Sequence, residues 1–80
     1  MTVQQIADQY KKASLKARRT PGKCVKIHAG SYFLWDGETL WNIYQAIENQ
    51  GQPWIAVDYA APRSTYTDFF DTKTQVIASL

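Results

Sequence analysis

A chain of 80 residues is long enough for one domain, and its 45% hydrophobic and 14% aromatic content is typical of a chain that folds. Its single cysteine excludes an internal disulfide, and no apolar run approaches the roughly 20 residues that span a bilayer. We therefore expect one compact domain over residues 1–80, located in the cytoplasm, with no export signal and no membrane partner.

The net charge of +2 conceals a polarity along the chain. Residues 1–28 hold seven basic side chains and one acidic side chain, a net charge of +6. Residues 29–80 hold two basic and six acidic side chains, a net charge of −4. Such polarity favours oppositely charged partners and speeds association with them, although it does not determine a fold.

A first helix is expected directly after Thr2, because Thr2 and Gln5 have the spacing of a capping box. In the following residues, apolar and small side chains recur on one side of the helix and Lys and Arg side chains lie outside it. Leu15 falls on the basic side. Pro21 and Gly22 end the helix. One face of this helix is therefore predicted to pack, and the other to be basic.

Two short runs rich in β-branched and aromatic side chains, residues 25–27 and 32–35, predict a β-hairpin. If Gly30 and Ser31 form a two-residue turn, the register follows from the turn. A shift of one residue would reverse the faces of the second strand. The expected pairs are Ile27 with Leu34, His28 with Phe33 and Lys26 with Trp35, which leaves Ile27 and Leu34 together on one face.

A second helix is expected after a turn that includes Asp36 and Thr39 as alternative caps. Its apolar stripe has the spacing i, i+3, i+4 and i+7, and Gly51 follows as a natural stop. The stripe consists of Leu40, Ile43, Tyr44 and Ile47.

Three more strands are expected in the rest of the chain, at 54–59, 66–70 and 75–80, with the last two joined as a hairpin. Phe69 and Phe70 fit a helical turn equally well. The expected order is helix, strand, strand, helix, strand, strand, strand. We therefore predict an α+β fold with an antiparallel sheet of about four to five strands and both helices on one face.

Signatures of catalysis or metal binding are lacking. Cys24 and His28 could act as nucleophile and base, but residues four apart on a strand are separated by about 13 Å, beyond hydrogen-bond reach. One Cys and one His are too few soft ligands for zinc, the acidic residues are scattered, and the glycines stand alone. We expect no enzymatic activity, no cofactor and no metal.

Aromatic and arginine side chains are abundant for so small an interior: three Trp, five Tyr and three Arg. These residue types often dominate protein interfaces. We therefore predict a non-enzymatic interaction module that binds a protein partner, such as the small adaptors and inhibitors that phages and mobile elements encode. The residues expected at its interface are Lys11, Lys12, Lys16, Arg18, Arg19, Lys26, Trp35, Trp41, Arg63 and Tyr66.

Nucleic-acid binding through the basic helix and the 24–35 hairpin is the alternative. Lys and Arg would follow the phosphates, while Phe33, Trp35 or His28 would stack on bases. Trp and Lys/Arg side chains on a shared face would favour nucleic acid, and an opposed arrangement would favour a protein. A small-ligand site within 58–68 and a homodimer formed through sheet edges are further hypotheses.

Overall fold

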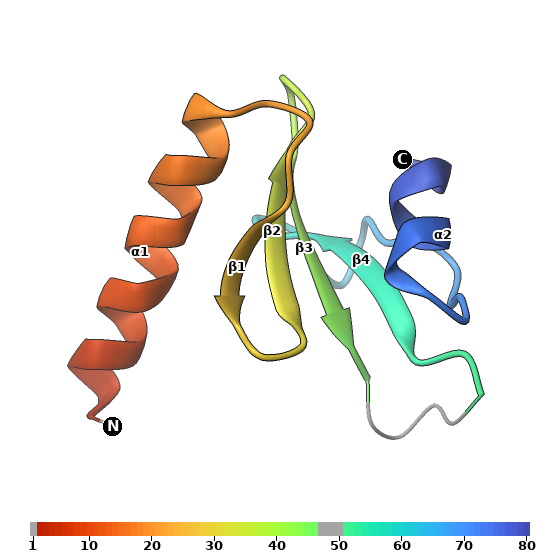
Figure 1. Cartoon of the computed structure of the whole chain (residues 1–80), viewed down its shortest axis with the longest axis horizontal. Helices are drawn as coiled ribbons and strands as arrows, with labels where there is room; N and C mark the ends of the chain where they lie inside the picture. Colours follow the sequence, from red (N-terminus) through yellow and green to blue (C-terminus); the bar gives the residue numbers. More distant parts are fainter. Residues whose placement is uncertain (1, 47–50) are drawn as a thin grey trace.

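The computed structural model describes residues 2–46 and 51–80. At its centre is an antiparallel sheet in which each strand pairs with the strand that follows it in the chain (Figure 1). The expected α+β class is confirmed, and the described residues form four strands rather than five. The elements in chain order are α1 (Val3–Arg19), β1 (Val25–His28), β2 (Ser31–Trp35), β3 (Leu40–Gln45), β4 (Trp54–Asp58) and α2 (Lys73–Ser79).

Helix α1 begins with the expected capping box. The Thr2 hydroxyl accepts a hydrogen bond of 3.2 Å from the Gln5 amide, and the Gln5 side chain accepts one of 2.9 Å from the Thr2 amide. Ala13 and Ala17 are the buried residues of the helix. Because both side chains are small, α1 lies close against the sheet, and its lysines and arginines remain exposed.

The two helices cover opposite faces of the sheet, so the prediction that both lie on one face is wrong (Figure 1). Phe33 packs with Val25 under α1, whereas the next residue, Leu34, packs with Ile43 and Val76 under α2. Successive side chains of a strand point to opposite faces, so β2 supplies apolar residues to two separate core clusters. The molecule therefore has three layers, helix, sheet and helix.

The turn of the β1–β2 hairpin lies one residue earlier than expected, so the register differs from the predicted one. Its turn is formed by Ala29 and Gly30, and Gly30 has a φ of +77°, a left-handed value that glycine adopts without strain. Ser31 is buried and begins β2 instead of belonging to the turn. The predicted pairs are therefore wrong: the observed ones are Val25 with Phe33, Lys26 with Tyr32 and His28 with Ser31, with a bulge between Lys26 and His28.

Residues 40–45, which we expected to begin a helix, form strand β3. Leu40 and Ile43 are both buried, but Leu40 lies in the α1 cluster and Ile43 in the α2 cluster. A strand that is buried on both faces carries apolar residues at odd and at even positions alike. Two of them can therefore be three residues apart, which is also the spacing of neighbours on a helix face. Ala46 follows β3 and is not helical, and the rest of the expected helix, 47–50, lies outside the described residues.

The expected C-terminal hairpin is also wrong, because residues 73–79 form helix α2. Thr72 and Gln75 make a capping box, and Val76 is fully buried against the sheet. Residues 66–70 run along the outer edge of β4 instead, with isolated bridges from Tyr66 to Val57 and from Phe70 to Trp54. The two segments that we expected to pair as a hairpin therefore do different things: residues 66–70 cover the edge of β4, and residues 73–79 form a helix that covers one face of the sheet.

Candidate functional site

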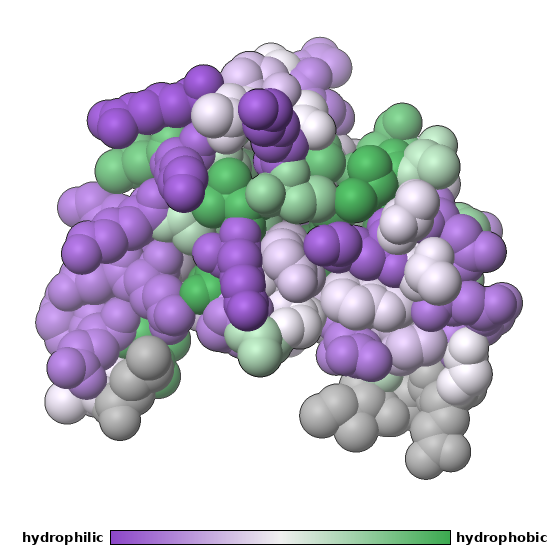
Figure 2. Space-filling model, in the orientation of Figure 1, coloured by the Kyte–Doolittle hydropathy of each residue, from purple (hydrophilic) through white to green (hydrophobic). Residues whose placement is uncertain are grey.

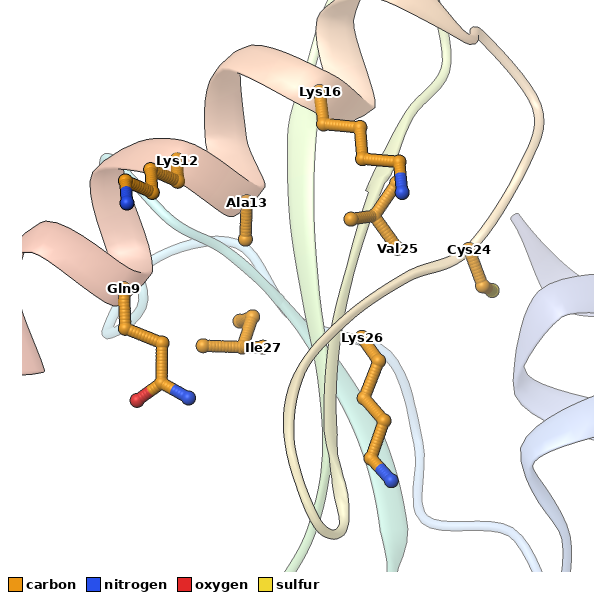
Figure 3. Close-up of a pocket in the computed structure, with 8 residues that line it drawn as sticks. All are labelled: Gln9, Lys12, Ala13, Lys16, Cys24, Val25, Lys26 and Ile27. Atoms are coloured by element: carbon orange, nitrogen blue, oxygen red, sulfur yellow. The ribbon is translucent and has the colours of Figure 1, made fainter.

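A groove of about 370 Å³ lies between α1 and the edge strand β1 (Figure 3). Ala13, Val25 and Ile27 give it an apolar floor. Lys12 and Lys16 stand on its helix side. Lys26 also lines it and leaves β1 on the other side, pointing away from the helix. We call this site the lysine groove; its remaining lining residues are Gln9 and Cys24.

Local structure explains why the three lysines line this groove from two sides. Lys12 and Lys16 are one helical turn apart, on the side of α1 next to the buried Ala13. Lys26 lies between the buried Val25 and Ile27 on β1, and the alternation of the strand directs its side chain to the opposite face.

Among the described residues, no acidic side chain contacts the ammonium groups of Lys12, Lys16 and Lys26. All three side chains are exposed. Unpaired like charges beside apolar walls produce a positive potential that attracts anionic groups. Figure 2 shows hydrophilic side chains over α1, with hydrophobic atoms visible between the helix and the strands.

The two edges of the sheet differ. Along β4, Trp54 and Phe70 exchange backbone hydrogen bonds of 3.0 and 2.8 Å, and the Thr67 amide donates to the Ala56 carbonyl at 2.9 Å. The Ala56 amide donates to the Thr67 hydroxyl, and the Asp58 amide to the Thr65 carbonyl. Residues 65–70 therefore cover this edge. Within the described part of the chain, β1 has one neighbouring strand, β2, and no segment pairs with its outer edge.

The ten predicted interface residues do not form one surface. Arg18 and Trp35 contact each other near the end of α1, where the guanidinium carbon lies 5.4 Å from the ring centroid. Lys11 lines a different depression, beside Tyr10 and Tyr59, and Arg19 is exposed. The structure brings three of the ten together at the lysine groove: Lys12, Lys16 and Lys26.

Trp41, Arg63 and Tyr66 lie elsewhere. Trp41 is half-buried on the α2 face of the sheet, and its indole N–H donates a hydrogen bond of 2.9 Å to Asp36 Oδ2. Arg63 and Tyr66 are exposed in the segment after β4, and Tyr66 is 60% exposed. These three residues share no surface with the lysine groove.

The aromatic side chains near the basic helix are engaged within the protein. Phe33 is fully buried, so the hypothesis that it stacks on bases is wrong. Trp35 is half-buried in the α1 cluster. The Tyr10 hydroxyl bonds His28 Nε2 at 3.0 Å, and His28 Nδ1 lies 3.2 Å from the Ala29 carbonyl. This pattern favours the tautomer in which Nδ1 carries the proton and Nε2 accepts from Tyr10.

Cys24 and His28 are directed to different parts of the molecule. Cys24 packs against the α2 cluster, whereas His28 bonds Tyr10 of α1. Burial raises the pKa of the Cys24 thiol, and the nearby charge of Lys73 partly offsets that rise. Over residues 2–46 and 51–80, no three His, Cys, Asp or Glu side chains gather as a metal site, and no helix is both long and apolar enough to cross a membrane.

No protein-family model matches the chain, and no curated protein or solved structure shows significant similarity to it. A function for the chain therefore has to come from its own surface chemistry. Sequence reasoning identified the lysines of the groove but missed its floor and its free edge. The alternation Val25-Lys26-Ile27 was a usable signal, because it places one lysine opposite two apolar residues.

Proposed function

We propose that this protein is a non-enzymatic interaction module that binds an acidic segment of a protein partner at the lysine groove, in the manner of a small adaptor or inhibitor. The observation that carries the proposal is the combination of an apolar floor with three lysines whose ammonium groups no described acidic side chain contacts. Charge complementarity supplies association rate and selectivity, and burial of an apolar side chain on the floor supplies affinity.

The distribution of tryptophans supports a protein partner over nucleic acid. Trp41 and Trp54 lie on the α2 face of the sheet, away from the basic helix, and Trp35 is packed beside Arg18. Binding of single-stranded nucleic acid usually needs exposed rings next to the cations. Of the large exposed aromatics, Tyr66 and Phe69 lie in the segment after β4, and Tyr59 lies beside Lys11 of α1. Asp58 adjoins Tyr59 in the sequence, and Asp68 lies within two residues of Tyr66 and Phe69, so these carboxylates would repel phosphates near the three rings.

The test is a titration of the isotope-labelled protein with glutamate-rich peptides and, separately, with single-stranded oligonucleotides. A double variant, Lys12→Glu with Lys16→Glu, should weaken peptide binding by about tenfold or more, because it inverts the charge on the helix side of the groove. The matched control, Lys11→Glu with Arg19→Glu, makes the same change in net charge on the same helix and should weaken binding by less than about threefold.

Two results would overturn the proposal. One is peptide binding that both double variants weaken equally, since the groove would then have no special part. The other is an absence of peptide binding. Oligonucleotide binding that falls steeply with salt would in that case establish the nucleic-acid alternative through the exposed cations of α1.

A further inference from the structure

We infer that the acidic partner segment binds as an extended strand added to the free outer edge of β1. This inference rests on the proposed function and specifies the form in which the partner is recognised. Strand addition to an exposed sheet edge is a recurrent mode of peptide recognition, in which backbone hydrogen bonds give affinity and alternate side chains give specificity.

Backbone geometry identifies the groups that are available. The Gln45 amide donates to the Gly30 carbonyl, so Gly30 directs its backbone toward β3. Successive residues of a strand direct their backbone groups to opposite sides, so every second residue after Gly30 also bonds β3. These residues are Tyr32 and Leu34. Phe33 therefore bonds β1 through its partner Val25. The next residue of β1, Lys26, consequently directs its N–H and its carbonyl outward, where no described group bonds them.

The difference between the two sheet edges strengthens the inference. The same alternation directs Trp54, Ala56 and Asp58 outward from β4, and residues 65–70 bond all three. Proteins protect edge strands because unpaired edges bind other chains. Here one edge is covered by the chain itself, while the other remains open beside an apolar groove.

Charge determines which kind of segment fits. Side chains of an added strand would point alternately toward α1 and toward the opposite face. Those on the α1 side would meet the apolar floor and, at its rim, Lys12 and Lys16, while those on the other side would meet Lys26. An extended segment in which acidic and apolar residues alternate satisfies both sides. The bulge between Lys26 and His28 limits regular pairing to the part of β1 around Val25 and Lys26.

A second copy of this chain is a poorer occupant of the same edge. Pairing β1 with the β1 of another copy would place two sets of Lys12, Lys16 and Lys26 in one symmetric interface. Like charges close together across strands are destabilising. The homodimer considered from the sequence is therefore disfavoured at this edge.

The experiment uses the full chain and a short peptide of alternating glutamate and valine. Hydrogen exchange of the Lys26 amide, followed by NMR, should slow by about tenfold or more at saturating peptide. The Val25 amide already bonds β2 and should change much less. The same peptide with every backbone nitrogen methylated keeps its charges but loses all of its backbone donors, and it should bind at least about tenfold more weakly.

A pair of protein variants separates the contribution of the Lys26 charge to peptide binding from that of its backbone N–H. Lys26→Gln removes the charge and keeps the outward N–H, whereas Lys26→Pro removes both. Proline is tolerated where an edge N–H faces solvent, and the NMR spectrum checks that the fold is intact. Lys26→Pro should bind the peptide more weakly than Lys26→Gln.

The outcomes distinguish this inference from the proposed function. If the peptide binds and the Lys12/Lys16 double variant weakens it, but Lys26 exchange and N-methylation have no effect, strand addition is overturned and the docking function stands. If no acidic peptide binds, both fail. If slow Lys26 exchange appears without peptide and depends on protein concentration, the occupant is a second copy and the inference is overturned.

Discussion

Arg18 lies over the ring of Trp35, with its guanidinium carbon 5.4 Å from the ring centroid. The contact joins the last turn of α1 to strand β2 at the end of the α1 core cluster. Arg18 is exposed, so the cation–π attraction is of the modest kind found at protein surfaces.

Replacing Arg18 by alanine should therefore lower the free energy of unfolding by about 0.5–1 kcal/mol. Urea denaturation followed by tryptophan fluorescence measures this change. Arg19→Ala is the control, because Arg19 is exposed on the same helix and contacts no ring. Equal effects of the two substitutions would mean that the ring contact contributes nothing beyond the charge.

Asp36 should make stability depend on pH. Hydrogen bonds from the Thr39 amide, the Trp41 indole and the Glu38 amide hold the pKa of its carboxyl below the ordinary value. The stabilisation is complete above the unfolded-state pKa of about 3.9, and it is lost as the pH falls through the lower pKa of the folded state.

The corresponding measurement is thermal unfolding of the wild type and of Asp36→Asn between about pH 6 and pH 2.5. The variant should be less stable than the wild type near neutral pH, and the difference should shrink as the pH falls below about 4. Asp68→Asn serves as a control, since the exposed Asp68 carboxylate accepts no such hydrogen bonds from the described residues. A constant gap between Asp36→Asn and the wild type would contradict this prediction.

Helix α2 depends on its N-cap residue, Thr72. The Gln75 amide donates to the Thr72 hydroxyl at 3.3 Å, and the Thr72 amide donates to the Gln75 side chain at 3.1 Å. Thr72→Ala should cost about 0.5–2 kcal/mol of stability, because it leaves a helix amide without its cap. Thr74→Ala, at an exposed helical position, should be neutral or slightly stabilising, since alanine favours helix. Chemical denaturation of both variants checks the difference.

The close approach of α1 to the sheet depends on Ala17, whose side chain is fully buried. Ala17→Leu should destabilise the protein by about 1–3 kcal/mol, because the larger side chain has no space. Ala7→Leu makes the same substitution at an exposed position of α1 and should change stability by less than about 0.5 kcal/mol. A similar loss in both variants would show that helix spacing is not the cause.

Local sequence signals were sufficient to predict α1. Its cap at Thr2 and its stop at Pro21 and Gly22 are in or next to the helix itself. They failed where burial came from both sides of the sheet. Leu40 and Ile43 are three residues apart because each packs under a different helix, on opposite faces of the sheet. The sequence does not show this arrangement unless the position of α2 is already known. The hairpin register depended on the position of the turn and on the bulge between Lys26 and His28, and the error exchanged the environments of Phe33 and Leu34.

The candidate site was predictable only in part. The charges of Lys12, Lys16 and Lys26 are evident in the sequence, but their grouping depends on which strand lies at the edge of the sheet. Which of the two sheet edges stays open depends on residues 65–70 covering β4, and this involves long-range backbone hydrogen bonds without a local signature.

The meander order of the sheet also has a kinetic consequence. Every strand pairs with its successor, so each hairpin closes a short loop and loses little chain entropy in doing so. Topologies of this kind, with contacts between residues near in sequence, fold faster than sheets that need distant strands to meet. We expect the hairpins to form early, and the attachment of residues 65–70 and of α2 to complete the native state.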